Sequence, residues 1–139
     1  MILTIGICTI PERVEQLKKV VDSINLQKTD EVELIVFMDN RTIPLGVKRQ
    51  MIADSANGKY ISYVDDDDRI YKKYVKIILN AAKHDPDIIS IKAEYSADGA
   101  KPIPVYFDIN DTDRDGKGCF IRIPNHLCAI KTSIVKEIG

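Results

Sequence analysis

The chain alternates short, continuous apolar segments with longer segments in which apolar residues recur every three or four positions. Short segments rich in β-branched residues are typical of strands buried on both faces of a sheet, and the longer period is typical of helices that cover it. We expect strands over Leu3–Cys8, Glu33–Met38, Tyr60–Val64 and Asp87–Lys92. This alternation predicts an α/β fold with a mostly parallel central sheet flanked by helices.

Three helices are expected around these strands. The first has a proline just before it, and its apolar stripe consists of Val14, Leu17, Val21 and Ile24. The second covers about 46–56 and ends at Asn57-Gly58, a pair suited to a left-handed cap. The third ends before Asp85-Pro86. Its inward-facing residues are expected to be Tyr74, Ile77, Ile78 and Ala81.

The final third of the chain is dense in Asp, Gly and Pro, which predicts loops and a β-hairpin. We expect a further strand over Cys119–Ile123 and a short helix from Lys131, capped by Thr132. The segment "DTDRDG", Asp111–Gly116, opens like a calcium-binding loop. Its twelfth position is Arg122 rather than glutamate and no expected helix flanks it, so a polar hairpin turn is the better interpretation.

The composition is that of one ordinary globular domain, with 139 residues of which 45% are hydrophobic and 29% charged. Lys and Arg total 20 against 21 Asp and Glu, so general binding of nucleic acid is not expected. Cys8, Cys119 and Cys128 lack metal-ligand spacing and are expected to be reduced. Neither a signal peptide nor an apolar run near the roughly 18 residues of a membrane span is visible, so we expect a cytoplasmic protein.

Four adjacent aspartates, Asp65 to Asp68, directly follow the third expected strand. Adjacent carboxylates repel one another unless a cation or the start of a helix compensates them. In one interpretation Asp67 and Asp68 cap the next helix and the others are solvated. In the other, the carboxylates hold Mg²⁺ or Mn²⁺ for a phosphorylated ligand, because ligands of open α/β sheets bind at the carboxyl ends of the strands.

Polar residues also follow the first two expected strands, and two cations lie in the second helix. All of them are expected to gather at the same edge of the sheet, since the carboxyl ends of parallel strands meet there. They are Thr9, Pro11 and Arg13 after the first strand, Asp39, Asn40 and Arg41 after the second, and Lys48 and Arg49 in the helix.

Three ordered motifs carry a resemblance to a known family. The segment Gly46–Asp68, "GVKRQMIADSANGKYISYVDDDD", resembles without gaps the signature of family-two glycosyltransferases of the GT-A fold, which ends in Asp-x-Asp. "ICTIPERVEQL" and "RIPNHLCAIKTSIVKEIG" resemble the nucleotide-binding first turn and the acceptor-side segment of a bacterial and phage subgroup. The resemblance implies one GT-A domain over 1–139, with a nucleotide-binding half over about 1–95 and a hairpin and acceptor-side segment over about 96–139.

The resemblance also implies roles for the aspartates. Asp65 and Asp67 match the Asp-x-Asp pair, with Asp67 the more direct metal ligand and Asp65 nearer the ribose or sugar. Asp66 falls among the nucleotide- and sugar-binding positions, pointing away from the pair, and Asp68 starts the next helix. Asp39 matches the carboxylate that accepts a hydrogen bond from the nucleotide base; a strand-end turn residue is the alternative.

Thr9, Pro11 and Arg13 match the turn around the nucleoside, although Arg13 is open to a second interpretation as a solvated residue of the first helical turn. Arg49 matches an arginine near the diphosphate or sugar. Gln50 departs from the family, which usually has Asn there.

Asn125 and His126 match the acceptor-side motif, so we expect them to touch the sugar, the acceptor or the metal. A hydrogen-bonded structural histidine is the alternative for His126. With Asp65 and Asp67, His126 completes the predicted catalytic residues. His84 is expected to be a solvated residue at a helix end.

The implied function is transfer of a sugar from a nucleotide diphosphate sugar, foremost a UDP-sugar, to a hydroxyl of a glycan, lipid or protein, with inversion and with Mn²⁺ or Mg²⁺. Family members continue past the segment matching Gly139 into a Gly-Glu-Asp stretch that resembles the general base. A nucleotide- or nucleotide-sugar-binding module that does not complete the reaction is therefore a second hypothesis. A phosphohydrolase with an Asp-x-Asp nucleophile is a third, disfavoured by Arg69 where such enzymes carry Thr or Val.

Overall fold

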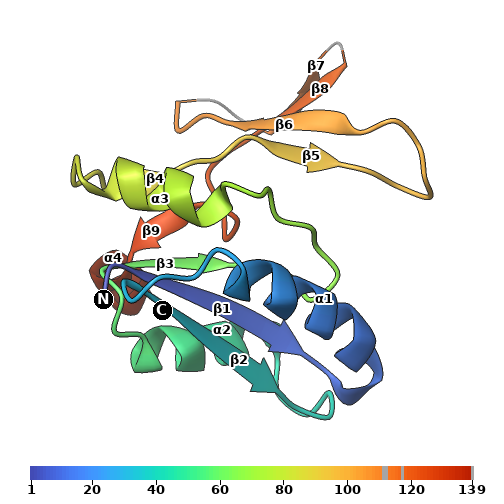
Figure 1. Ribbon diagram of the computed structural model, residues 1–139. Helices are drawn as coiled ribbons and strands as arrows, with labels where there is room; N and C mark the ends of the chain where they lie inside the picture. Colours follow the sequence, from blue (N-terminus) through green and yellow to red (C-terminus); the bar gives the residue numbers. More distant parts are fainter. Residues whose placement is uncertain (111–112, 117, 139) are drawn as a thin grey trace.

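The computed structural model describes residues 1–110, 113–116 and 118–138, and its main sheet has five strands (Figure 1). These are β1 (Leu3–Thr9), β2 (Val32–Met38), β3 (Tyr60–Tyr63), β4 (Ile88–Ile89) and β9 (Ala129–Lys131). Their order across the sheet is β2-β1-β3-β9-β4. Strand β1 is parallel to β2 and β3, whereas β9 is antiparallel to both of its neighbours. The sheet is therefore mixed, with β9 as its reversed strand.

Helices cover both faces of this sheet. They are α1 (Val14–Asn25), preceded by the 3-10 turn η1 (Pro11–Arg13), α2 (Leu45–Ser55), α3 (Tyr74–Ala82) and α4 (Thr132–Ile138). Buried residues of α1 and α3 share one core cluster with β1, and α2 contributes to a second cluster, against which Val135 of α4 packs. The predicted α/β architecture is confirmed.

The alternation of side chains along β1 decides which residues enter each core. Leu3, Ile5 and Ile7 are fully buried in the cluster shared with α1 and α3. Gly6 faces α2 instead, where a Cβ would approach Ile52 to 2.8 Å and Tyr63 to 3.0 Å. The lack of a side chain at Gly6 therefore allows α2 to pack closely on the sheet.

The apolar stripes predicted for α1 and α3 are confirmed at most positions and wrong at one position in each helix. Val14 is 45% exposed and Ile77 is 43% exposed. Val14 is the first residue of α1 and lies at the margin of its stripe. In α3 the buried face is centred between Tyr74 and Val75, so Ile77 lies more than about 100° away around the helix axis.

The final third of the chain forms a second sheet (Figure 1, top), and the predicted hairpin is confirmed within it, where Arg114–Gly116 pairs antiparallel with Cys119–Arg122. Its strands, in the order β5-β6-β8-β7, are β5 (Ala93–Tyr95), β6 (Ile103–Phe107), β8 (Cys119–Arg122) and β7 (Arg114–Gly116). Strands β6 and β8 are parallel, a pairing that local turn signals do not indicate. Residues 111 and 112 of the calcium-like segment lie outside the described residues.

The predicted strand over Asp87–Lys92 is wrong for most of its length. It is reduced to the two residues of β4, because the chain leaves the main sheet after Ile89 and enters the second sheet at Ala93. Ile91, between the two sheets, still packs against the main core.

The end of α2 differs from the predicted left-handed cap, because its C-cap residue Ala56 is extended, with φ −68° and ψ 132°. Glycine is needed at position 58 for a different reason: a Cβ there would lie 2.4 Å from the amide nitrogen of Thr4 and would clash with it. The Gly58 amide donates to Thr4 Oγ1 (2.9 Å), and Thr132 Oγ1 donates to the Gly58 carbonyl (2.6 Å). Thr132, the predicted helix cap, thus joins α4 to this turn.

Replacing Gly58 with Ala is expected to lower the free energy of unfolding by about 1–3 kcal/mol, the usual cost of overpacking. Two of the three obstructing atoms, the Thr4 nitrogen and the Leu3 carbonyl carbon, belong to the backbone of β1 and cannot rotate away. Urea unfolding followed by circular dichroism measures the effect. Gly46→Ala in α2 is the matched control, because nothing lies within 4 Å of a Cβ there and alanine favours helix. Equal stability of the two variants would contradict this role of Gly58.

Candidate functional site

The carboxyl ends of β1, β2 and β3 meet at one edge of the main sheet. Pairing in register places Thr9 beside Met38 and Gly6 beside Tyr63. The ladder continues one residue further, since the Asp39 amide donates to the Thr9 carbonyl (3.4 Å) and the Val64 amide to the Gly6 carbonyl (3.0 Å). The residues that follow the three strands are thereby brought to the same edge.

The four aspartates form a turn rather than the start of a helix. The Asp68 amide donates to the Asp65 carbonyl (3.1 Å), and Asp68 Oδ2 accepts a hydrogen bond from the Asp65 amide (3.2 Å). The predicted capping of the next helix by Asp67 and Asp68 is wrong, because α3 begins only at Tyr74, and its N-cap residue is Lys73. Partial burial raises the pKa of Asp68, whose carboxylate stabilises the turn itself.

Asp66 is the buried member of the turn, with a relative exposure of 2%. Its carboxylate accepts hydrogen bonds from Thr9 Oγ1 (2.8 Å) and from Arg13 Nη1 (2.9 Å). A buried carboxylate requires such partners, because the loss of hydration is otherwise uncompensated. We call these three residues the Asp66 cluster; it joins the turn after β1 to the acidic turn after β3.

Asp65 lies between two basic side chains. Arg49 Nη2 is 3.3 Å from Asp65 Oδ1, and His126 Nε2 is 3.7 Å from Asp65 Oδ2, too long for a hydrogen bond. His126 first and Arg49 second hold the pKa of Asp65 below its usual range, against the opposing effect of burial. Within the described residues, His126 Nε2 is buried without a hydrogen-bond partner.

Asp67 is the most open of the four, with a side chain that is 61% exposed and whose charged contact is Arg13 Nη1 at 3.9 Å. The described residues contain no group of three or more His, Cys, Asp or Glu side chains that could hold a metal ion. A cation at Asp67 would therefore take most of its ligands from water and from a bound phosphate, as Mg²⁺ commonly does.

Asp39 is a turn residue in this structure. Its side chain is 6% exposed; Oδ1 is paired with Lys48 Nζ, and Oδ2 accepts hydrogen bonds from the amides of Thr42 (2.8 Å) and Ile43 (2.9 Å). Lys48 and these amides lower the pKa of Asp39 to about 2. The contacts match the turn alternative. Lys48 lies four residues before the buried Ile52 in α2, and residues at that spacing share one face of a helix. This spacing was the one indication in the sequence that Lys48 is buried beside the sheet.

The segment after β8 brings the acceptor-side residues to this edge. The Tyr63 amide donates to the His126 carbonyl (3.1 Å), so the segment is bound to the end of β3. Asn125 Oδ1 accepts a hydrogen bond from the Leu127 amide (3.0 Å) and shapes the local turn. Pro11 is the first residue of η1. The structure therefore gathers the predicted residues of all three motifs at one place.

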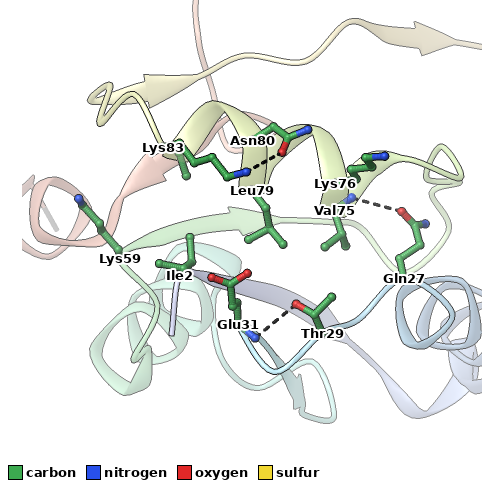
Figure 2. Close-up of a pocket in the computed structure, with 11 residues that line it drawn as sticks. Ile2, Gln27, Thr29, Glu31, Lys59, Val75, Lys76, Leu79, Asn80 and Lys83 are labelled. Carbon is green, nitrogen blue, oxygen red and sulfur yellow. Dashed lines mark hydrogen bonds between the residues drawn. The ribbon is translucent and has the colours of Figure 1, made fainter.

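A cavity of about 380 Å³ lies elsewhere, between α3 and the loop before β2 (Figure 2). Its lining includes Ile2, Glu31 and Lys59, which immediately precede β1, β2 and β3. The cavity thus opens at the amino ends of the strands, opposite the acidic turn.

Three further expectations concern His84, the cysteines and membrane-spanning helices. His84 is exposed after the end of α3, as predicted. Cys8, Cys119 and Cys128 are free thiols. In the described part of the chain, every helix is too short or too polar to cross a membrane.

No protein-family model and no curated protein matches this sequence. Among solved structures, S. aureus TarS 1-349 matches with a TM-score of 0.72 and 16% identity, over 99% of this chain and 49% of that chain. TarS 1-349 in complex with UDP-GlcNAc matches with a TM-score of 0.62 and 12% identity, over 99% and 47% of the two chains. The chain spans about half the length of these structures. The likeness confirms the predicted GT-A fold.

The Asp66 cluster is expected to couple Asp66 and Arg13 energetically. Asp66→Ala leaves buried Thr9 Oγ1 with only the long contact to the Ile10 carbonyl (3.4 Å), and the expected cost is about 1–3 kcal/mol. A double-mutant cycle with Arg13→Ala, measured by urea unfolding, is expected to give a coupling free energy above about 0.5 kcal/mol. Additive effects would show that the contact contributes nothing. Glu12→Ala in place of Arg13→Ala is the control, because Glu12 lies in the same turn and does not contact Asp66.

The Asp39–Lys48 pair is expected to make the fold acid-sensitive. The pKa of Asp39 is about 2 in the folded chain against an ordinary value of 3.8. Its stabilising contribution is therefore complete above about pH 4 and is lost as pH falls towards 2. The unfolding free energy of Asp39→Asn, measured from pH 5 to pH 2, is expected to fall less steeply than that of the wild type. Parallel curves would contradict the assignment.

Proposed function

We propose that this chain binds a UDP-sugar at the carboxyl edge of the main sheet and transfers its sugar to an acceptor hydroxyl, with Mn²⁺ or Mg²⁺ as cofactor. The observation that carries the proposal is that the four aspartates of the acidic turn have different environments. Asp65, Asp66 and Asp68 have partners within the protein, while the Asp67 carboxylate is largely exposed at the edge where α/β folds bind ligands. The GT-A fold and the three sequence motifs agree with this use.

The residues fit a divalent cation held by one carboxylate and a diphosphate. Asp67 supplies the exposed oxygen ligand, and Asp65, which remains paired with Arg49, is proposed to lie nearer the ribose or sugar. The cation, when bound, neutralises charge on the leaving diphosphate. Arg13 and Arg49 add positive charge on the protein side, and the Asp66 cluster holds the nucleoside turn against the acidic turn.

The choice of a UDP-sugar is supported by TarS, which has been crystallised in complex with UDP-GlcNAc and with UDP. The Asp39 carboxylate is proposed to lie beside the nucleotide base and to accept a hydrogen bond from it. Lys48 holds the carboxylate in position. Thr9 and Pro11 belong to the turn proposed to surround the nucleoside.

His126 and Asn125 are proposed to face the sugar or the acceptor. Within the described residues the buried Nε2 of His126 has no hydrogen-bond partner, which supports this placement, since such atoms are rare in folded proteins. The alternative function, binding of a nucleotide sugar without turnover, keeps the same donor site.

Isothermal titration of the full chain with UDP, with and without Mn²⁺, tests the proposal. Binding is expected to need the cation and to weaken at least about 10-fold in Asp67→Ala, since even indirect partners of a metal alter its affinity by 10–100-fold. Asp30→Ala is the matched control, because Asp30 is exposed near the opposite edge of the sheet. Absence of UDP binding in the wild type would refute both functions, and hydrolysis or transfer of a UDP-sugar separates the enzyme from the binding module.

A further inference from the structure

Helix α3 and the loop before it carry positive charge alone. Between residues 69 and 84 there is no Asp or Glu, and five exposed cations define what we call the basic face. They are Arg69, Lys72, Lys73, Lys76 and Lys83. Since the whole chain carries −1 and this segment +5, the other residues together carry −6. Charge is therefore segregated across the molecule.

Helix α3 and its two cap residues present Lys73, Lys76 and Lys83 outward, whereas Arg69 and Lys72 are exposed in the loop before it. Positions 73, 76, 77, 80, 83 and 84 are exposed and follow the spacing of one helical stripe. The opposite stripe is buried against the main sheet and consists of Tyr74, Val75, Ile78 and Ala82. The core thus holds α3 in place with this exposed stripe on its outer side.

The basic face is not neutralised within the described residues. Its first four cations make no ion pair or side-chain hydrogen bond there, and Lys83 contacts a neighbouring asparagine oxygen (3.3 Å). The acidic residues just beyond α3 are used elsewhere: Asp85 pairs with Lys59 (2.8 Å) and Asp87 pairs with Lys131 (2.8 Å). The charge of this face is therefore available to a partner.

Apolar groups are interleaved with these cations. Tyr71 and Ile77 are each 43% exposed among them. On the flank of α3, the cavity of Figure 2 has an apolar part formed by Ile2, Val75, Leu79 and Ala82. Three lysines and one acidic side chain, Glu31, also line it. A partner that complements this face carries negative charge at its surface and has an apolar layer directly below that surface.

We propose that the basic face docks on an anionic lipid membrane. Anionic headgroups attract clustered lysines, and Tyr71 and Ile77 can enter the headgroup boundary beside them. The net charge of −6 on the remaining residues orients the molecule with this face towards the membrane. The same charge disfavours nucleic acid, because a long polyanion would extend past the face towards acidic parts of the protein.

Co-sedimentation of the full chain with lipid vesicles tests this docking. We expect binding to phosphatidylcholine vesicles that contain phosphatidylglycerol, little binding to pure phosphatidylcholine, and weakening with added salt. Lys73→Glu combined with Lys76→Glu is expected to reduce binding at least about 25-fold, since each lysine near an anionic surface contributes roughly fivefold. Ile77→Ser is expected to give a smaller loss.

Lys101→Glu combined with Lys136→Glu is the matched control, because it changes the net charge equally at exposed lysines outside α3. Retained binding in this control supports a specific face, whereas equal loss in both double variants overturns it. Equal binding to both kinds of vesicle also overturns the proposal. Tighter binding of the wild type to duplex DNA than to anionic vesicles would assign the face to nucleic acid instead. Circular dichroism of each variant confirms that it is folded.

Discussion

Mutual repulsion among four adjacent carboxylates is the constraint on which the site depends. The structure meets it by giving each aspartate a different environment. Asp66 is buried against Arg13 and Thr9, Asp65 faces Arg49 and His126, and Asp68 accepts a backbone hydrogen bond within the turn. Asp67 is left largely exposed. A run of identical residues thus acquires distinct chemical roles through its partners, which come from segments far apart in the sequence.

The scaffold serves this arrangement through close packing. Because Gly6 has no side chain, α2 lies close to β1, and its cations Lys48 and Arg49 reach the carboxyl edge of the sheet. The ring of Tyr63 lies under the Arg49 guanidinium (5.6 Å), and its hydroxyl donates to the Arg49 carbonyl (2.7 Å). Positive charge is therefore held beside the aspartates by the core itself, and a donor diphosphate would meet a preorganised site.

Two surfaces with opposite charge characterise the molecule. The carboxyl edge of the sheet concentrates the acidic groups proposed to hold a cation and a nucleotide. The outer stripe of α3 carries lysines that form no ion pair within the described residues. If both proposals hold, α3 would keep the domain at a membrane surface while the edge of the sheet binds a donor from solution. The two uses do not compete, since no residue belongs to both sites.

The alternation of buried strands and amphipathic helices was sufficient to predict the α/β fold, because burial on a sheet imposes that period on local sequence. The motifs likewise indicated which residues gather at the carboxyl edge. The sequence did not reveal the parallel pairing of β6 with β8, the spatial need for Gly58, or the end of α2, since each depends on contacts between distant segments. The tertiary structure alone decided which aspartate is buried, which is paired and which is exposed. Neighbours in the chain have the same intrinsic charge, and only partners such as Thr9, Arg13 and His126 distinguish them.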